Sequence, residues 1–315
     1  MTILKQVLTL ISILSIIIVF IALIGNMLSF YLFSKKKFKK TFFSFYFRVE
    51  IIFDSLFLLI TVNYSLENLF SIDFKILSNL TCKLYYYFAD IVTPIGHWIL
   101  VLVTIDRYLS IVSPSKFLFR NKKVFRLISC LVIVLFNIVF YIPDLIFYDL
   151  KLSYFDNLIN NQTIIESKFI CVRDVVVLNY LNFLNDCLLP FIFIMIFTIL
   201  LIKAIYISRK KSRSNQSTPP TSFNNNNKIK TKDARFAFTS IAVNLVFVCL
   251  TLPSYLTLMI GLYDYEIFVV IDSIFYFLYF CQFGSIFFVN YLTNVIFRNE
   301  FKSLIRMNNK SKSNS

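Results

Sequence analysis

Three consecutive residues, Asp106-Arg107-Tyr108, place an acid, a base and a phenol at the end of a long apolar run. A charge inside a bilayer costs about 2.5–3.5 kcal/mol on insertion scales, so such groups usually face a bundle interior or a water-filled cavity. In such a place the Asp and Arg side chains can form an ion pair that opens and closes. The simpler interpretation is an arginine that snorkels to the membrane surface beside a local acid. The rest of the chain decides between the two.

The composition is that of a membrane protein. Mean hydropathy is +0.73, with 58% hydrophobic and 16% charged residues, whereas soluble domains carry about 25% charged residues. The net charge of +15 would suit a nucleic-acid partner. That partner is excluded because the basic residues cluster in short runs between apolar segments. The lipid bilayer is therefore the expected surrounding.

Seven apolar segments are long enough to cross a bilayer as helices, which takes about 20 residues each. They cover residues 6–34, 43–69, 84–106, 127–143, 175–202, 236–263 and 267–297. The first segment is too long for a signal peptide and lacks a cleavage site, so it is interpreted as a retained helix. The predicted fold is an all-α membrane protein, a seven-helix bundle.

Polar segments complete the predicted domain organisation. Residues 298–306 have apolar positions at i, i+3 and i+4 and predict a short amphipathic eighth helix at the membrane surface. Residues 208–232 are polar and of low complexity, with an Asn run and Pro-Pro, and predict a disordered loop. Residues 1–306 would thus form one bundle domain, followed by a disordered tail at 307–315.

Basic residues fix the expected orientation, because cytoplasmic loops are enriched in Lys and Arg. Of the 32 basic residues, 26 fall on the side that follows the first, third, fifth and seventh segments. Of the 17 acids, 12 fall on the other side. We expect an extracellular N-terminus, a cytoplasmic C-terminus, a plasma-membrane location and an acidic outer mouth that attracts cations.

Two cysteines and three sequons lie on the expected outer side, and the sequon at Asn63 is expected to be too close to the bilayer to be modified. Cys82 opens the third segment and Cys171 lies in the longest outer loop, at about 145–174, where an oxidising compartment favours a disulfide. Asn79 and Asn161 head outer sequons and are predicted to be glycosylated. The inner sequons should stay unmodified; they begin at Asn215 and Asn309.

Several short motifs have the joint spacing of a known family. Cys82 precedes Arg107 by 25 residues, and Asn290 precedes Phe301 by eleven. Further matches are Gly25-Asn26, Asp54, Pro114, Pro190, Phe247 and Pro253. With seven segments and Asp-Arg-Tyr after the third, the chain resembles the rhodopsin-like (class A) G-protein-coupled receptors over nearly its whole length. The resemblance implies an extracellular ligand and a heterotrimeric G protein as partners, without a cofactor.

The departures from that pattern indicate a divergent receptor. The seventh-helix motif is Asn290-Tyr291-Leu292-Thr293-Asn294 and lacks the usual Pro and Tyr. Thr251 stands where a Trp is usual in helix six, and Thr198 where a Tyr is usual in helix five. Gly96 replaces a Ser of the family's sodium pocket, which would otherwise keep Asp54 and Asn290. These changes concern the route of activation rather than the fold.

By this resemblance, signalling would centre on Arg107. Asp106 would pair with it in the resting state, and Asp233, at the base of helix six, would be a second partner. Opening of helix six would then expose Arg107 to the G protein. The simpler interpretation of Asp233 is a solvated loop charge. The residues assigned to coupling are Asp106, Arg107, Tyr108, Asp233 and Asn290.

The expected ligand site is acidic and aromatic, and Asp90 is its leading residue. One face of the third helix would present Tyr86, Asp90, Thr93 and His97 at helical spacing. The later helices would add Asp186, Tyr255 and Asp272. Ala89 stands where amine receptors of the family carry their Asp, so a basic or amidated neuropeptide fits better than an amine. Alternatively, Asp90 is a structural partner of Lys83 or of a neighbouring helix.

Other classes of protein fit the sequence less well. A channel or transporter would require a polar pore stripe or repeated halves with broken helices, and no repeat is evident. An enzyme would need a catalytic constellation, but the single histidine lies within a membrane segment and no ligands have metal-site spacing. An odorant-type chemosensory receptor shares every motif and remains the main alternative.

Overall fold

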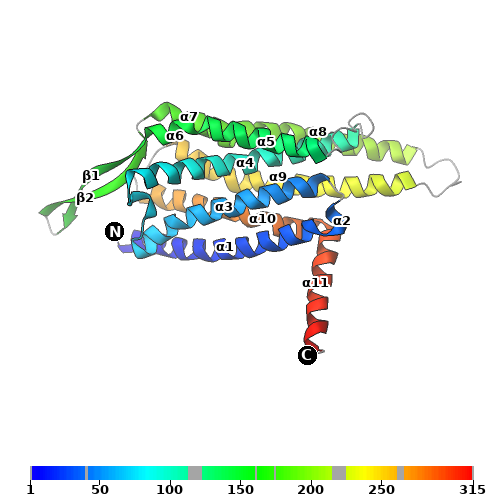
Figure 1. Ribbon diagram of the computed structural model, residues 1–315, viewed down its shortest axis with the longest axis horizontal. Helices are drawn as coiled ribbons and strands as arrows, with labels where there is room; N and C mark the ends of the chain where they lie inside the picture. Colours follow the sequence, from blue (N-terminus) through cyan, green and yellow to red (C-terminus); the bar gives the residue numbers. More distant parts are fainter. Residues whose placement is uncertain are drawn as a thin grey trace.

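The computed structural model describes residues 2–39, 42–112, 123–159, 162–173, 175–214, 225–260 and 266–313. Its long helices run side by side in one bundle, with the N-terminus at one end of the bundle and the C-terminus at the tip of a helix that projects from the other end (Figure 1). The long helices are α1 (Thr2–Ser34), α3 (Phe42–Phe70), α4 (Asn79–Val112), α5 (Lys123–Phe140), α8 (Leu189–Ser214), α9 (Asn225–Ile260) and α10 (Glu266–Thr293). This arrangement confirms the predicted seven-helix membrane bundle.

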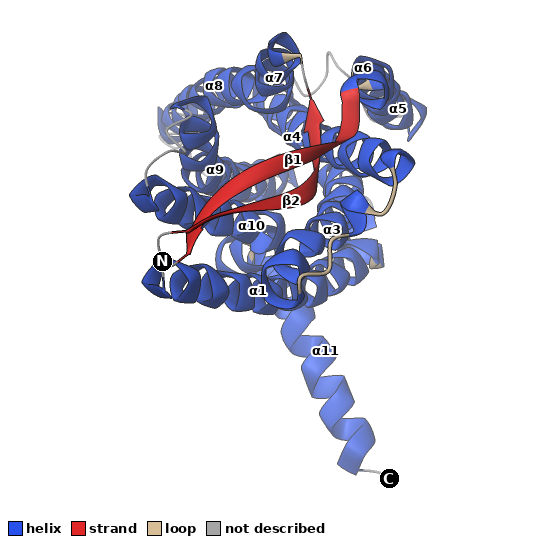
Figure 2. Ribbon diagram, turned by 90° about the vertical axis from the view of Figure 1, so that its left-hand side faces the viewer, coloured by secondary structure: helices blue, strands red, loops and turns tan. Residues whose placement is uncertain are grey.

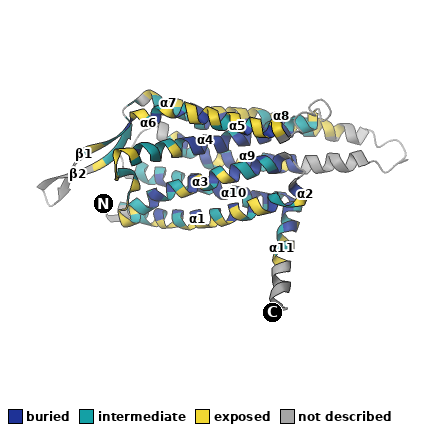
Figure 3. Cartoon of the chain, in the orientation of Figure 1, coloured by how far each residue is buried: buried dark blue, intermediate teal, exposed yellow. Residues whose placement is uncertain are grey.

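Six of the described helical segments are long and apolar enough to cross a membrane by composition alone. The seventh, α3, carries Arg48, Glu50 and Asp54, which lower its apolar character, yet it packs within the bundle against α1 and α4. Large apolar residues are exposed along the other helices, as Phe20 and Met27 are on α1. Figure 3 shows exposed positions recurring along α1, α5 and α8. In a bilayer these outward faces meet lipid rather than water.

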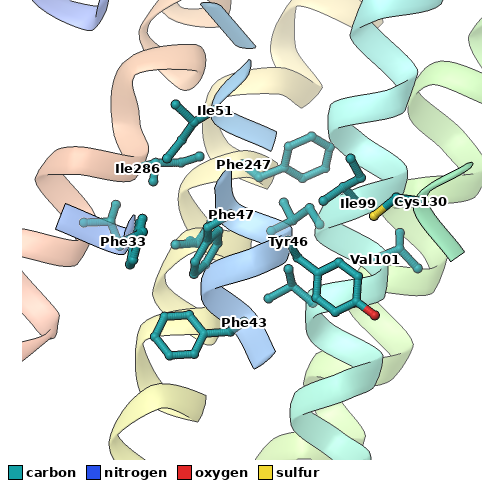
Figure 4. Close-up of a cluster of buried hydrophobic side chains, with 14 of the residues drawn as sticks. Phe33, Phe43, Tyr46, Phe47, Ile51, Ile99, Val101, Cys130, Phe247 and Ile286 are labelled. Carbon is teal, nitrogen blue, oxygen red and sulfur yellow. The ribbon is translucent and has the colours of Figure 1, made fainter. Parts of the chain in front are cut away.

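Aromatic packing between α1, α3, α4, α9 and α10 forms the main core. Phe33, Phe43, Phe47 and Phe247 are each 2% exposed or less, and they lie around α3 together with Ile51 and Ile286 (Figure 4). The Phe33 and Phe47 rings are stacked at 5.5 Å between centroids. The 38 phenylalanines therefore serve the core as well as the lipid face.

The fifth span is not a regular α-helix. It consists of α7 (Val176–Phe183), the π-helical turn η3 (Leu184–Leu188) and α8. The Leu189 N–H bonds to Leu184 O, five residues back. Pro190 follows at once and has no N–H to offer, so the carbonyls of Asn185 and Asp186 are left for partners outside the helix.

The longest outer loop, for which the sequence analysis predicts no secondary structure, is largely a hairpin. Strands β1 (Tyr148–Ile159) and β2 (Gln162–Arg173) are antiparallel, with Tyr148 opposite Arg173. Apolar and polar residues alternate along the start of β1, from Leu150 to Ser153, which is the period of a strand. Figure 2 shows this hairpin crossing the end of the bundle.

The polar segments differ from the sequence predictions. Helix α8 runs to Ser214 and α9 begins at Asn225, so both helices enter the range 208–232 that was predicted to be disordered. Residues 215–224 of that range lie outside the described part of the chain. The turns α2 (Lys36–Lys39), η1 (Phe74–Ile76) and α6 (Ile142–Phe147) complete the connections.

The seventh span ends earlier than predicted, at Thr293 rather than 297. The Asn294 side chain accepts hydrogen bonds from the N–H groups of Ile296 (3.1 Å) and Phe297 (3.2 Å), which starts a new helix. That helix, α11 (Val295–Ser313), is longer than the expected 298–306 and also covers most of the tail predicted to be disordered. It leaves the bundle at a steep angle (Figure 1).

Candidate ligand site and coupling end

The two ends of the bundle differ in structure. The hairpin end carries β1, β2 and the N-terminus, and the Arg107 end carries α2 and α11 (Figure 1). The sequence assigned a ligand site to the first and a coupling site to the second.

Three predicted ligand residues meet in one cluster inside the bundle. His97 Nδ1 lies 3.1 Å from Asp186 Oδ1 and 2.7 Å from the Asp186 carbonyl oxygen. The Tyr255 hydroxyl donates to Asp186 Oδ2 and lies 3.3 Å from the Tyr279 hydroxyl. His97 is 1% exposed and Tyr255 is 9% exposed. The Asp186 carboxylate links η3 to α4 and α9, and the Tyr255 hydroxyl extends the cluster to α10.

The π-helical turn explains why Asp186 can hold this place. An α-helix would pair the Asp186 carbonyl with the N–H of residue 190, which is a proline. His97 approaches that carbonyl instead. The Asn185 carbonyl is bonded by Trp98 Nε1 at 3.2 Å. Two neighbouring α4 side chains thus satisfy the two carbonyls that the turn exposes.

Asp90 lies among further charges at the hairpin end. Its electrostatic neighbours are Asp144, Arg173 and Asp186. Arg173 Nη1 is 2.6 Å from Asp144 Oδ1. Lys83, the alternative partner weighed for Asp90, instead pairs with Asp149 at 3.1 Å. Among the described residues, Asp90 therefore has two carboxylates and one guanidinium as electrostatic neighbours, and that guanidinium is already paired with Asp144.

Aromatic rings cover these acids at the base of the hairpin. Tyr86 stacks on Tyr148 with 4.2 Å between ring centroids, and Arg173 lies 5.0 Å from the Tyr148 ring centre. Burial raises the pKa of the Tyr148 phenol, which stays protonated at neutral pH. The sequence did not single out Tyr148, Asp144, Arg173 or Tyr279 for this site.

Two predicted ligand residues have other contacts. The Thr93 hydroxyl bonds back to the Ala89 carbonyl of its own helix at 3.0 Å. Asp272 accepts a hydrogen bond from Thr257 Oγ1 at 2.7 Å, between α9 and α10. These contacts leave Thr93 and Asp272 outside the hydrogen-bonded cluster of His97, Asp186 and Tyr255 in the described part of the chain.

The hairpin is tied to α4 by covalent and polar contacts. Cys82 and Cys171 form a disulfide with 5.8 Å between their Cα atoms, as predicted. Asn79 Nδ2 donates to Asp149 Oδ1 at 3.3 Å and Asn79 Oδ1 accepts from the Leu150 N–H at 3.0 Å. Hydrogen bonds from Lys83 and Asn79 hold the pKa of Asp149 below its ordinary value. Asn161 lies outside the described residues.

At the opposite end, Asp106 and Arg107 form a buried ion pair. Arg107 Nη2 is 2.7 Å from Asp106 Oδ2, and each residue is 4% exposed. The Arg107 guanidinium lies 5.3 Å from the centre of the Phe43 ring, and the Tyr108 ring lies 6.0 Å from Phe197. Asp233 belongs to α9, but its side chain lies outside the described residues.

A buried amide joins three helices between the two ends. Asn244 Nδ2 of α9 donates to Thr104 Oγ1 of α4 at 3.0 Å and to Thr198 Oγ1 of α8 at 2.7 Å. Thr198 stands where the family usually has a tyrosine. The sequence did not identify Asn244; its single signal was an amide in an otherwise apolar segment.

The residues of the predicted sodium site fit a cation. Within the described residues, Asp54 Oδ2, Asn26 Oδ1 and Asn290 Oδ1 are buried and lack hydrogen-bond partners. They are oxygen donors from α3, α1 and α10, which pack together. A Cβ at Gly96 would lie 3.2 Å from Asp54 Oδ1, so glycine keeps space beside that carboxylate.

Seven helices around buried polar contacts, with a disulfide-linked hairpin over one end, define a multi-pass membrane protein of receptor type. A model of the family "7 transmembrane receptor (rhodopsin family)" matches residues 25–294. The chain therefore belongs to this family, whose members are receptors that signal through G proteins rather than enzymes. Comparison with curated proteins finds no match.

Proposed function

We propose that this receptor binds a basic or amidated peptide at the hairpin end, which faces the outside of the cell. The proposal rests on one observation: Asp90 has two further carboxylates, Asp144 and Asp186, among its electrostatic neighbours, and the neighbouring Arg173 already pairs with Asp144 at 2.6 Å. A desolvated carboxylate without a cation is costly. A ligand that brings a positive charge would supply the missing partner.

The aromatic rings around the acids favour a ligand larger than an amine. Tyr86 and Tyr148 stack at the base of the hairpin, and Tyr255 and Tyr279 meet beside Asp186. Such rings bind apolar side chains and cations on their faces. A short peptide with one basic group and apolar side chains would use both kinds of contact.

Activation would begin at Asp186 and end at Arg107. Tyr255 and the bend residue Pro253 belong to the same helix, α9, and Tyr255 donates to Asp186. A cationic ligand that draws Asp186 away would release this bond and let α9 move. Movement of α9 would expose the Asp106–Arg107 pair to the G protein, with Asp233 as a second restraint on Arg107.

The ligand proposal is tested by a screen of basic peptides, amines and neutral odorants on cells, with nucleotide exchange as the readout. Asp90→Asn should weaken a cationic agonist about 30-fold or more, because truncating one partner of a desolvated charge pair costs about 2–5 kcal/mol. Asp272→Asn is the matched control and should change potency less. Activation by neutral odorants alone would overturn the proposal.

The coupling proposal is tested separately at the Arg107 end. Arg107→Ala should abolish agonist-driven nucleotide exchange while surface expression and ligand binding persist. Arg298→Ala, in α11, is the matched control and should retain exchange. Asp233→Ala should raise basal exchange if that acid restrains Arg107. Unchanged exchange in Arg107→Ala would remove Arg107 from the mechanism.

Sodium would be held by Asp54 and Asn290 and would supply a charge that stabilises the resting arrangement. Asp54→Asn should therefore make agonist binding insensitive to replacement of sodium by choline. Equal sodium sensitivity in Asp54→Asn and the unmodified receptor would argue against this site.

A further inference from the structure

A groove opens on the lipid-facing side of the bundle, between α4, α5 and the fifth span. Its volume is about 430 Å³, within the range of about 300–1,000 Å³ that ligand pockets occupy. Val132 and Phe136 of α5 form one wall and Leu184 and Leu189 the other. These four side chains are 38–59% exposed. They lie in spans that cross the bilayer, so lipid is what reaches the groove.

The polar groups in the groove already have partners. Trp98 Nε1 donates to Asn185 Oδ1 at 3.1 Å, and Asn185 Nδ2 donates to Asn137 Oδ1 at 2.9 Å and to the Tyr141 hydroxyl at 3.3 Å. None of the lining residues is charged. The open surface is therefore hydrocarbon, which suits a hydrocarbon ligand rather than a headgroup.

The π-helical turn η3 lies between this groove and the acidic cluster, by which we mean Asp186 with its partners His97 and Tyr255 and the nearby Asp90 and Asp144. Asn185 faces Trp98 and the groove, while the next residue, Asp186, faces His97 and Tyr255. Their partners on α4, Trp98 and His97, are also consecutive residues. A change in the position of η3 on one side must therefore alter contacts on the other.

We propose that the groove binds the acyl chain of a lipid that enters from the bilayer, and that the bound chain is coupled through η3 to Asp186. The volume accommodates one chain rather than a whole phospholipid. That the groove binds an acyl chain is independent of the proposed function. That the bound chain is coupled to Asp186 rests on the proposed function, in which Asp186 belongs to the ligand site.

Trp98 makes the binding directly measurable, because it is the only tryptophan of the chain and lines the groove. The full-length receptor in lipid nanodiscs is titrated with a fatty acid brominated in mid-chain, which quenches tryptophan on contact. Quenching should saturate at a low mole fraction and be relieved by unlabelled palmitate. Quenching that rises linearly with mole fraction would show bulk lipid contact only and overturn the proposal.

Two substitutions should narrow the groove from opposite walls, Val132→Phe and Leu184→Phe. Each should raise the half-saturating mole fraction fivefold or more. Leu131→Phe is the matched control, because Leu131 is 48% exposed on the same helix but does not line the groove. Equal shifts in Val132→Phe and Leu131→Phe would refute a specific site. Relief of quenching by cholesterol but not by palmitate would replace the acyl chain by a sterol and overturn the assignment.

Coupling is tested with the same readout, since coupling between sites is reciprocal. Asp186→Asn, on the far side of η3, should shift the half-saturating mole fraction by about fivefold or more, a typical coupling effect. Asp272→Asn, outside η3, should not. An unchanged value in Asp186→Asn would overturn the coupling. Neither measurement requires an agonist or a G protein, so failure here is distinct from failure of the proposed function.

Discussion

Single buried polar residues hold neighbouring helices of this receptor together at defined points. Asp186 joins η3 to α4 and α9 near the hairpin end, and Asn244 joins α9 to α4 and α8 farther along the bundle. Both contacts involve α9, the helix expected to move on activation. A buried polar group that loses its partner costs about 1–3 kcal/mol, so each contact biases the position of α9.

Asn244→Ala should raise basal nucleotide exchange. The substitution removes the amide that bonds Thr104 and Thr198, both of which are buried, and so releases α9 from α4 and α8. We expect a loss of about 1–3 kcal/mol from the resting arrangement. Basal exchange in membranes containing the purified G protein measures it.

The control for that measurement is Thr61→Val. The Thr61 hydroxyl is buried but bonds to the Phe57 carbonyl of its own helix, at 2.8 Å. Its loss should lower thermal stability without changing basal exchange. If Asn244→Ala and Thr61→Val alter basal exchange equally, the inter-helix bond of Asn244 has no special part in the resting state.

The residues of the acidic cluster could be predicted only in part. Helical spacing placed Asp90 and His97 on α4, and the proline pattern placed Asp186 and Tyr255 on their helices. Asp144 and Arg173 come from the two flanks of the hairpin, 29 residues apart. Asp144 and Arg173 meet only because β1 pairs with β2, and no sequence pattern near either residue predicts that contact.

At the scale of helices, α1 and α10 approach each other closely at one glycine. A Cβ on Gly284 would lie 2.6 Å from Ala22 Cβ and 3.0 Å from Ala22 Cα. No side chain can be accommodated there without moving a helix. The contact therefore depends on two small residues that face each other.

Gly284→Ala should destabilise the receptor by about 1–3 kcal/mol, the usual cost of overpacking a core. The double variant Ala22→Gly/Gly284→Ala should recover part of the loss, because it removes the 2.6 Å contact between the two Cβ atoms but leaves the 3.0 Å contact with the Cα of residue 22. Thermal unfolding in detergent, followed through thiol accessibility, measures both. An additive loss in the double variant would mean that the two helices do not meet at this point.

Helix α11 is held at the Arg107 end by charged contacts. Glu300 lies 3.4 Å from Lys35 Nζ and also bonds Lys37. Hydrogen bonds from Lys37 hold the pKa of Glu300 below its ordinary value. A lowered carboxyl pKa stabilises the docked helix above the ordinary pKa, and this stabilisation is lost as pH falls through the lowered value.

Glu300→Gln should therefore loosen α11. Backbone amides of residues 298–306 should exchange about twofold to fivefold faster at neutral pH, as expected for a pair whose Lys37 side chain is 70% exposed. Lys36→Gln, an exposed neighbour of the pair, is the control. At a pH low enough to protonate Glu300, the variant and the unmodified receptor should exchange alike; a difference that persists there would point to another cause.

The helices were more predictable than the segments that join them. Runs of apolar residues fixed the cores of the spans, since about 20 such residues are needed to cross a bilayer. The hairpin was not predicted because only the start of β1 alternates clearly, while the pairing of β1 with β2 joins residues as far apart in the sequence as Tyr148 and Arg173. The end of α10 was missed because Asn294, a cap that starts α11, lies within a continuous apolar pattern. Caps of this kind interrupt a helix without interrupting its hydrophobicity.

On the scale of the whole molecule, charge differs between the two ends of the bundle. The Arg107 end carries the basic runs at 35–40 and 298–312, and the hairpin end carries most of the acids. Cytoplasmic loops are enriched in Lys and Arg, so the hairpin end is expected outside the cell. An acidic mouth also raises the local concentration of a cationic ligand, an effect that salt weakens.

This orientation makes a specific prediction about glycosylation, because oligosaccharides are added only on the luminal side of the membrane. In the sequence, Asn79 opens the third span and Asn161 lies between the residues of β1 and β2, whereas Asn215 and Asn309 follow the fifth and seventh spans. Asn79 is exposed at the start of α4. Mass mapping of receptor purified from eukaryotic cells, before and after enzymatic removal of glycans, should find sugar on the first pair alone.

Removing the sequons separates orientation from accessibility. Asn79→Gln and Asn161→Gln should each shift the receptor to higher electrophoretic mobility by one glycan, and the double variant by two. Asn215→Gln and Asn309→Gln should leave the mobility unchanged. Each sequon reports on which side of the membrane its part of the chain lies. Sugar on Asn215 or Asn309 would therefore show that the orientation is the reverse of the predicted one. The acidic cluster would then face the cytoplasm and could not receive an extracellular peptide.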